Sequence, residues 1–248
     1  MNNAKKLGYA ESNPVSDLNG DDVSAKLKIL SSLCFNSFIN GTIHKEGINF
    51  IDKVDINNAN NLGYKIKLLG VSELINNCVY QRVHPTLINK SSYIAGIDGV
   101  SNAVITDGVP VGQSTIQGEG AGAEATTSAL ISDISSILRG NVKFPFSIST
   151  KERRKLIFKD ISERTFSAYL RFEVIDKPGV LSNITKIFSK NRVSIKRLIQ
   201  NPYKSKKFSS IIIITHESKD KFLNKILKQI EKKPYIIKRP KLIRIGIN

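Results

Sequence analysis

Apolar side chains recur at helical spacing along the segment DDVSAKLKILSSLCFNSFI, which begins at Asp21. One face of a helix through this segment would carry Val23, Leu27, Leu30, Cys34 and Phe38, each three or four residues after the last. Asp21 can serve as the N-cap, and Asp22 would be favoured in the first turn by the helix dipole. We therefore expect a helix over residues 21–39, with Cys34 packed in its apolar face.

The following residues, up to about residue 88, predict a short helix and then two strands. Asp55 can cap a short helix that ends near Gly63, and residues 64–71 have the composition of a strand. Residues 77–88, NCVYQRVHPTLI, predict a further strand. Because proline has no N–H to offer a sheet, we expect that strand to stop at Pro85.

A hairpin and a helix complete this first block. Two strands are expected around a turn at Asp107-Gly108. The glycine loop GEGAG then leads into a helix whose apolar positions are Ala129, Ile131, Ile134 and Leu138. The block is α+β, with a sheet whose strands are joined mainly by short turns.

The remainder of the chain has the order βαββαβ. The expected elements are strands at 166–176, 193–202, 207–216 and 235–245, and helices at 180–191 and 218–233. This order is that of a split-βαβ, ferredoxin-like domain. The pattern breaks before it in a mixed, basic stretch. We therefore divide the chain into a first domain at 1–143, a linker at 144–164 and a second domain at 165–248.

Charge and cysteine content narrow the class of protein. The formal net charge is +17, but the basic residues are scattered and match no nucleic-acid-binding motif, so we expect no nucleic-acid partner. Cys34 and Cys78 are too few for a disulfide framework or a metal site, and a reducing cytoplasm suits them. No signal peptide or membrane-spanning run is evident. The three histidines lack ligand spacing, and His84 is interpreted as structural.

The start of the sequence gathers carboxylates ahead of a lysine. Glu11 and Asp17 lie in turn-rich sequence, and Asp22 and Lys26 are four residues apart on one helical face. On spacing alone, the pair would be an ordinary solvated ion pair. A lysine held among carboxylates can also donate a proton to a carbonyl oxygen.

The longer motif GYAESNPVSDLNGDDVSAKLKIL resembles the signature of the homoserine dehydrogenase family. The matching residues, in order, are Gly8, Tyr9, Glu11, Pro14, Asp17, Gly20, Asp22 and Lys26. RVHPTLI, GIDGVSNAV and GEGAGAEATTSALISDI also occur in the family's order, whereas Asn13 and Ala125 replace residues common there. The resemblance covers nearly all of residues 1–143 and implies a mixed-sheet catalytic domain that binds substrate and dimerises.

This resemblance implies a reaction and a set of roles. The family reduces L-aspartate 4-semialdehyde to L-homoserine with NADH or NADPH, in the biosynthesis of threonine, methionine and isoleucine. By position, Lys26 corresponds to the acid–base lysine and Asp22 to its carboxylate partner. Glu11, Asp17 and Tyr9 correspond to substrate-binding residues, of which the two carboxylates would attract the substrate's ammonium group.

The cofactor residues implied by the resemblance are Gly120, Gly122 and Glu11. The alternative for the two glycines is an ordinary turn before a helix. No G-x-G-x-x-G fingerprint follows a strand anywhere in the sequence. In the family, the dinucleotide-binding domain precedes the segment seen here. We therefore expect a fragment, a split gene or a misassigned start, whose main cofactor-binding domain is absent from these residues.

The second domain resembles the ACT regulatory domains. VIDKPGVLSNI matches their first strand-to-helix turn, with Asp176, Gly179, Val180, Leu181 and Asn183 as the expected effector-binding residues. Gly179 would let the backbone approach a ligand, and the helix N-terminus would offer N–H groups to a carboxylate. The resemblance implies an amino-acid effector such as threonine and a homodimer or tetramer. A turn without a ligand remains the alternative.

Two other functions compete with a homoserine dehydrogenase. One is a catalytically inactive, amino-acid-sensing ACT protein; the presence of Glu11, Asp22 and Lys26 argues against it. The other is a basic nucleic-acid-binding module, which only the net charge favours.

Overall fold

The structure is a computed structural model that describes residues 15–141, 149–203 and 207–246. The helices of this part are α2 (Val15–Asn19), α3 (Asp21–Phe35), α4 (Lys53–Asn61), α5 (Ala123–Leu138), α6 (Val180–Lys190) and α7 (Asp220–Glu231), with short 3-10 turns η1 (Tyr93–Gly96), η3 (Thr150–Glu152) and η4 (Ile161–Glu163). The strands are β1 (His44–Lys45), β2 (Tyr64–Ile75), β3 (Cys78–Asn89), β4 (Ser101–Gly108), β5 (Gly112–Glu119), β6 (Ile157–Lys159), β7 (Thr165–Ile175), β8 (Ile195–Pro202), β9 (Phe208–Thr215), β10 (Ser218–Lys219) and β11 (Lys241–Ile245). The predicted α+β class is confirmed.

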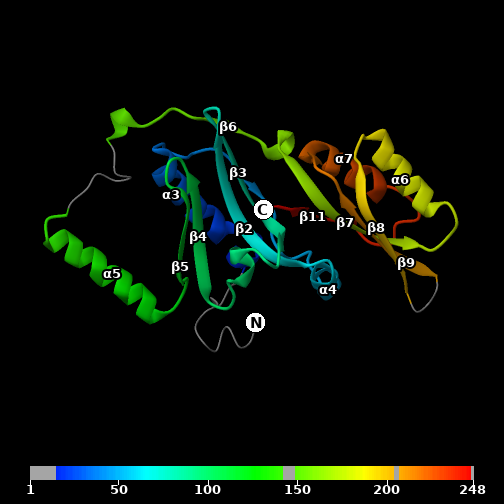
Figure 1. Cartoon of the computed structure of the whole chain (residues 1–248), viewed down its shortest axis with the longest axis horizontal. Helices are drawn as coiled ribbons and strands as arrows, with labels where there is room; N and C mark the ends of the chain where they lie inside the picture. Colours follow the sequence, from blue (N-terminus) through cyan, green and yellow to red (C-terminus); the bar gives the residue numbers. More distant parts are fainter. Residues whose placement is uncertain (1–14, 142–148, 204–206, 247–248) are drawn as a thin grey trace.

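A single sheet runs through both halves of the molecule in the order β1-β3-β11-β7-β9-β8. The last strand, β11, joins the halves: Arg244 is paired in parallel with Thr86 of β3 and antiparallel with Ala168 of β7. Figure 1 shows β11 reaching from the right-hand part to β3 at the centre. The sequence pattern predicted strands in each of two domains but not that the domains share a sheet, because nothing in it shows which strands become neighbours across domains.

The β2–β3 hairpin is longer than predicted. β3 continues through Pro85 to Asn89, so the predicted stop at Pro85 is wrong. On the edge of β3 away from β2, pairing with β1 ends at Val83 and pairing with β11 begins at Thr86. Pro85 therefore lies at the change of partner, where a missing N–H costs the sheet least.

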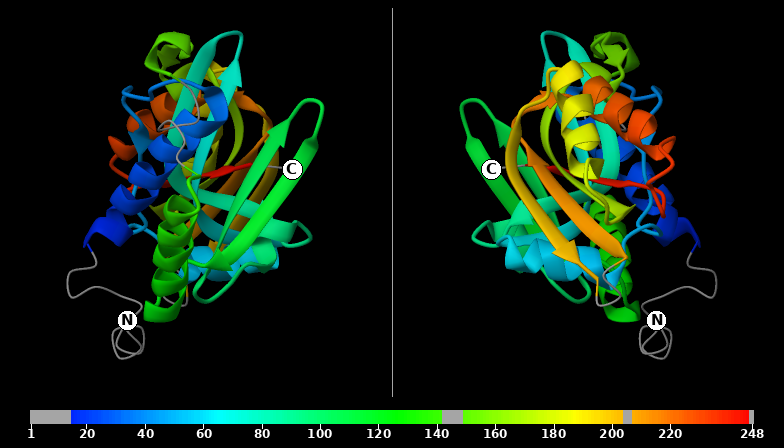
Figure 2. Two further views of the ribbon diagram at one scale, coloured as in Figure 1. Left: turned by 90° about the vertical axis from the view of Figure 1, so that its left-hand side faces the viewer. Right: turned by 90° about the vertical axis from the view of Figure 1, so that its right-hand side faces the viewer.

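The second half has the predicted βαββαβ order. Strands β7, β8, β9 and β11 carry α6 and α7 on one face, and the two helices lie beside each other (Figure 2). The core between sheet and helices is apolar and fully buried at Phe172, Ile184 and Ile226. The last strand is shorter than expected, since β11 spans only Lys241–Ile245.

The helix boundaries correct three expectations. α3 begins after Gly20, which has a left-handed φ of 78°, so Asp21 is a first-turn residue and not the N-cap. α3 ends at Phe35, and both Phe38 and Cys34 are exposed, which contradicts the predicted packing of these two side chains. The cap of α4 is Asp52, whose side chain accepts from the N–H groups of Val54 and Asp55.

The predicted linker contains ordered structure. β6 pairs in parallel with β3, with Phe158 opposite Val79, and Ile161 of η4 is buried in the core of the second half. This stretch therefore connects the halves through packing as well as through the chain.

In Figure 1, α5 lies at the end of the molecule away from α6 and α7, and the β4–β5 hairpin is drawn between α5 and β2. β4 extends to Gly108, which pairs with Gly112, so the turn lies later than the predicted Asp107-Gly108. The helix predicted after the glycine loop is confirmed as α5.

Candidate functional site

The junction between α2 and α3 places the carboxylates and the lysine. Gly20 adopts its left-handed conformation where the chain turns, and a Cβ there would lie only 2.9 Å from Cγ1 of Val83. The segment after β1 holds the junction, because the N–H of Ile48 donates to the carbonyl of Leu18 (2.8 Å). The start of α3 is thus fixed against β3 by close packing.

Asp22 and Lys26 form an ion pair at this position. Nζ of Lys26 is 2.8 Å from Oδ2 of Asp22, and their side chains are 52% and 43% exposed. The preceding residue, Asp21, pairs with Lys45 of β1. The positive end of the α3 dipole favours both carboxylates. A lysine that is paired and still accessible can meet a ligand's oxygen and donate a proton to it.

The other predicted substrate residues lie close in sequence but are only partly described. Asp17 lies in the first turn of α2 and is exposed, and its carbonyl accepts from the N–H of Gly20 (3.2 Å). Tyr9 and Glu11 lie outside the described residues.

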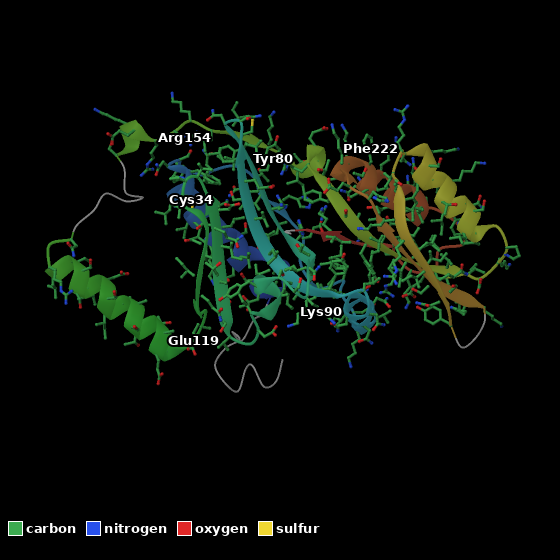
Figure 3. The ribbon with its side chains drawn as sticks, in the orientation of Figure 1. Cys34, Tyr80, Lys90, Glu119, Arg154 and Phe222 are labelled. Atoms are coloured by element: carbon green, nitrogen blue, oxygen red, sulfur yellow. The ribbon has the colours of Figure 1, made fainter. Side chains whose placement is uncertain are left out.

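The glycine loop follows β5, whose last residue, Glu119, is labelled in Figure 3. The N–H of Gly120 donates to the carbonyl of Val100 (3.0 Å), and a Cβ at Gly120 would collide with Asn102. Gly122 has a φ of 122° and faces open space. Among the described residues, no hydrogen bond or ion pair joins this loop to Asp22 or Lys26.

A separate cavity of about 340 Å³ lies at the predicted effector turn. Asp176, Gly179, Val180 and Leu181 line it. Asn183 does not line it, and its N–H donates to the carbonyl of Gly179 (2.9 Å) as part of α6.

Gln200 of β8 also lines this cavity. Its Nε2 donates to Oδ1 of Asp176 at 3.3 Å. No local pattern pointed to Gln200, because it comes from a strand that reaches the turn only through the sheet. A polar amide, a carboxylate and the start of a helix suit a zwitterionic ligand.

Buried charges join the halves beside the sheet. Arg244 donates from Nε to Asp220 (2.7 Å) and from Nη1 to Glu46 (2.8 Å). Burial would raise the pKa of Glu46, but the hydrogen bond from His44 and the charge of Arg244 outweigh it and lower this pKa to about 2. Sequence reasoning missed the Glu46–Arg244 pair, since 198 residues separate its members.

His84 is buried, as its structural interpretation requires. Burial, together with the positive charge of Arg244, lowers the pKa of His84 to about 3. Within the described ranges, no group of three His, Cys, Asp or Glu side chains could hold a metal ion. In the same ranges, no helix combines the length and apolar character needed to cross a bilayer.

These features define a two-part α+β protein in which the half that carries the Asp22–Lys26 pair and a ferredoxin-like half with a cavity at its first turn share one sheet. The family model for homoserine dehydrogenase matches residues 1–135, and a model for an ACT domain like that of the AHAS small subunit matches residues 170–238. Since the first match covers more than half of the sequence, the chain belongs to the homoserine dehydrogenase family.

Whole-chain comparisons agree. A homoserine dehydrogenase from Helicobacter pylori is 35% identical over 248 residues, covering 99% of this chain and 58% of that protein. A crystal structure of a homoserine dehydrogenase from Thiobacillus denitrificans matches with a TM-score of 0.88 and 32% identity, covering 99% of this chain and 57% of that one. One from Staphylococcus aureus matches with a TM-score of 0.68 and 28% identity, covering 100% and 58%. The chain thus spans a little under three fifths of the relatives it matches.

Proposed function

We propose that this chain provides the substrate-binding and acid–base part of a homoserine dehydrogenase, which reduces L-aspartate 4-semialdehyde to L-homoserine with NADH or NADPH in the cytoplasm. The observation that carries the proposal is the Asp22–Lys26 ion pair, 2.8 Å long, at the accessible start of α3. Membership of the family supports the substrate and the place of the reaction in threonine, methionine and isoleucine biosynthesis.

Each residue at this junction has a distinct task in the proposal. Lys26 donates its proton to the aldehyde oxygen as that oxygen gains negative charge, and takes the proton back in the reverse direction. Asp22 orients Lys26 and favours its charged form. The carboxylates of Asp17 and Glu11 hold the ammonium group of the substrate, and Tyr9 also contacts the substrate, which places the aldehyde next to Lys26.

The coenzyme would contribute the hydride. Of the coenzyme's binding site, this chain would supply only the glycine loop at Gly120 and Gly122. Gly122 leaves open space where a side chain would stand, which would allow a nicotinamide dinucleotide to approach the loop. No G-x-G-x-x-G fingerprint occurs in the sequence, and the described strands and helices therefore lack the turn that normally cradles the pyrophosphate. Under this proposal, turnover requires a dinucleotide-binding domain in addition to the residues of this chain.

The second half has a regulatory role in the proposal. The cavity at Gly179 would take an amino acid such as threonine, with the ligand carboxylate at the start of α6 and its ammonium near Asp176. ACT domains commonly pair, so we propose a homodimer or tetramer. A catalytically inactive amino-acid sensor is the second candidate, which the same cavity of about 340 Å³ favours.

The deciding experiment is an NADPH-oxidation assay with aspartate semialdehyde. The chain is tested alone and joined to the portion of the Helicobacter pylori relative that it does not match. We expect turnover only in the joined protein. We also expect the chain alone to bind NADPH more weakly than about micromolar, which cofactor fluorescence measures. A joined protein that is folded and binds NADPH but never reduces the aldehyde would favour the sensor.

A further inference from the structure

A second cavity, of about 550 Å³, lies where the two halves of the chain meet. His44 of β1 lines it from the first half, Asp160 and Ser162 line it from the turn η4, and the polar face of α7 lines it from the second half. Neither Lys26 nor Gly179 belongs to its lining, so it is distinct from the two sites described above. A cavity of this volume can hold a small metabolite, since such sites measure about 300–1,000 Å³.

Lysine side chains dominate the wall that α7 provides. Lys221, Lys225, Lys228 and the C-cap residue Lys232 follow one another at intervals of three or four residues and so lie on one face of the helix. Lys221 is paired with Glu163 (2.6 Å), but within the described residues none of the other three forms an ion pair. Like charges at this spacing weaken a helix, and a bound anion would relieve their repulsion.

The carboxylates close to this row are already occupied. Asp220 is only 2% exposed and accepts from Nε of Arg244 (2.7 Å) and from Nδ2 of Asn224 (2.6 Å). Glu231 pairs with Arg239 (3.3 Å), which does not line the cavity. A solvated helix face usually carries charges of both signs, whereas this wall keeps an excess of positive charge. The missing negative charge would come from a ligand.

The remaining lining residues indicate what else the ligand carries. The carboxylate of Asp160 accepts from the N–H of Ser162 (2.7 Å), and such a group repels phosphate but accepts hydrogen bonds from hydroxyls. No Phe, Tyr or Trp side chain lines the cavity, so a nucleobase would find no ring on which to stack. The row from Lys225 to Lys232 extends about 10 Å along the helix axis, which suits two phosphate groups better than one.

Buried hydrogen bonds connect the two walls. Arg244, which bonds Asp220 on one side, donates from Nη1 to Glu46 on the other (2.8 Å), and Glu46 accepts from Nε2 of His44 (2.7 Å). Asp220 and His44 both line the cavity. A ligand there would therefore contact both ends of this connection and would favour the arrangement in which the two halves are held together.

We propose that this cavity binds a sugar bisphosphate, with the phosphates on Lys225, Lys228 and Lys232 and the hydroxyls towards Asp160 and Ser162. The inference goes beyond the proposed function and does not depend on it, because it concerns neither the acid–base lysine nor the effector turn. Binding would link a phosphorylated metabolite to the junction between the halves.

The test is calorimetry of the full chain with fructose 1,6-bisphosphate as the probe, at one fixed ionic strength. One variant combines Lys225→Ala with Lys228→Ala. The matched control combines Lys186→Ala with Lys190→Ala on α6, which removes the same charge from exposed positions that line neither cavity. Circular dichroism establishes that both variants keep their fold. Pyrophosphate and citrate, titrated into the unaltered chain, separate phosphate and hydroxyl recognition from attraction to any anion.

We expect the α7 variant to weaken binding of the sugar bisphosphate at least about tenfold and the α6 variant to stay within about twofold of the unaltered chain. We also expect the sugar bisphosphate to bind at least about tenfold more tightly than pyrophosphate or citrate. No heat at about 10 mM of the probe, or equal weakening in the two variants, would overturn the site. Equal binding of citrate would show general attraction of anions, and equal binding of pyrophosphate would show that no hydroxyl is recognised; either result would contradict the proposal.

Discussion

Arg171 of β7 and Asp55 of α4 form a fully buried ion pair between the two halves of the molecule, with Nε of Arg171 2.7 Å from Oδ1 of Asp55. Their side chains are 1% and 0% exposed, although 116 residues separate them in the sequence. Asp52 and Lys241 extend the pair into a cluster. The halves are therefore joined by buried charge as well as by β11.

Replacing Arg171 with Met should destabilise the fold strongly. The substitution leaves Asp55 buried with only Lys241 as a charged partner, and breaking a buried pair from one side costs about 3–5 kcal/mol. The free energy of unfolding in urea measures the loss. Lys219→Met removes an exposed ion pair with Glu163 and should leave no resolvable change. If Arg171→Met lowered the free energy of unfolding no more than Lys219→Met does, a structural role for the cluster would be contradicted.

Stability should fall as the pH falls below neutrality, because of His84. Its pKa is lowered from 6.5 in the unfolded chain to about 3 in the folded one, so the folded state needs a neutral imidazole. The contribution is complete above about pH 6.5 and is lost as the pH falls towards 3, by up to about 1.4 kcal/mol per pH unit. Glu46, with its pKa lowered to about 2, adds a loss in the same direction, but only below about pH 4.5.

Urea titrations at pH 7, 6 and 5 test this assignment. His84→Gln should flatten the fall in unfolding free energy over that range, whatever it does to the absolute stability. His216→Gln, at an exposed position, should keep the slope of the unaltered chain. An unchanged slope in His84→Gln would assign the pH dependence to other groups.

Some of these features follow from the sequence and others cannot. The βαββαβ order, α3 and α5 follow from local periodicity, because the apolar face of each helix is written in consecutive residues. The pairing of β11 with β3 and the Arg171–Asp55 pair depend on contacts between distant segments, for which one sequence holds no signal. The exposure of Cys34 was mispredicted for a related reason, since the pattern marks an apolar face but not what covers it.

The candidate sites divide in the same way. The motif around Asp22 and Lys26 carries both residues within one turn, so spacing alone predicted their pairing. At the effector turn, the sequence supplied Asp176 and Gly179, but Gln200 joins them only through the neighbouring strand. Asn183 was expected there because of its position in the motif, and the geometry of α6 removes it from the lining.

Lys26→Ala should lower kcat by about a hundredfold to ten-thousandfold in a preparation that reduces aspartate semialdehyde, because it removes the proton donor. Asp22→Asn should lower kcat less, since it disturbs orientation and leaves the lysine in place. Lys45→Ala is the control: it breaks the neighbouring ion pair with Asp21 and should leave kcat close to the parent value. Steady-state kinetics on folded variants measure these changes. If the kcat of Lys26→Ala stayed within about threefold of the parent value, the role of Lys26 as proton donor would be refuted, because a general acid usually contributes far more.

Gly179→Val should abolish binding of a small amino acid at the effector turn. The glycine has a φ of 87°, and no atom lies within 4 Å of where its Cβ would stand, so a side chain there occupies the space that a ligand would use. The left-handed conformation also strains valine, by about 1–3 kcal/mol. Strain alone could loosen the fold, and Gly63→Val controls for it, because Gly63 has a φ of 84° with equally open surroundings at the end of α4.

Calorimetry of the full chain with threonine, serine, lysine and methionine measures the effect. We expect heat of binding with one of them, unchanged in Gly63→Val and absent in Gly179→Val. Gln200→Ala should weaken binding without loss of fold, because it removes the amide that holds Asp176. If a folded chain gave no heat with any of the four at about millimolar concentration, where even an affinity of about 4 kcal/mol is detectable, the second half would be an assembly domain and not a sensor.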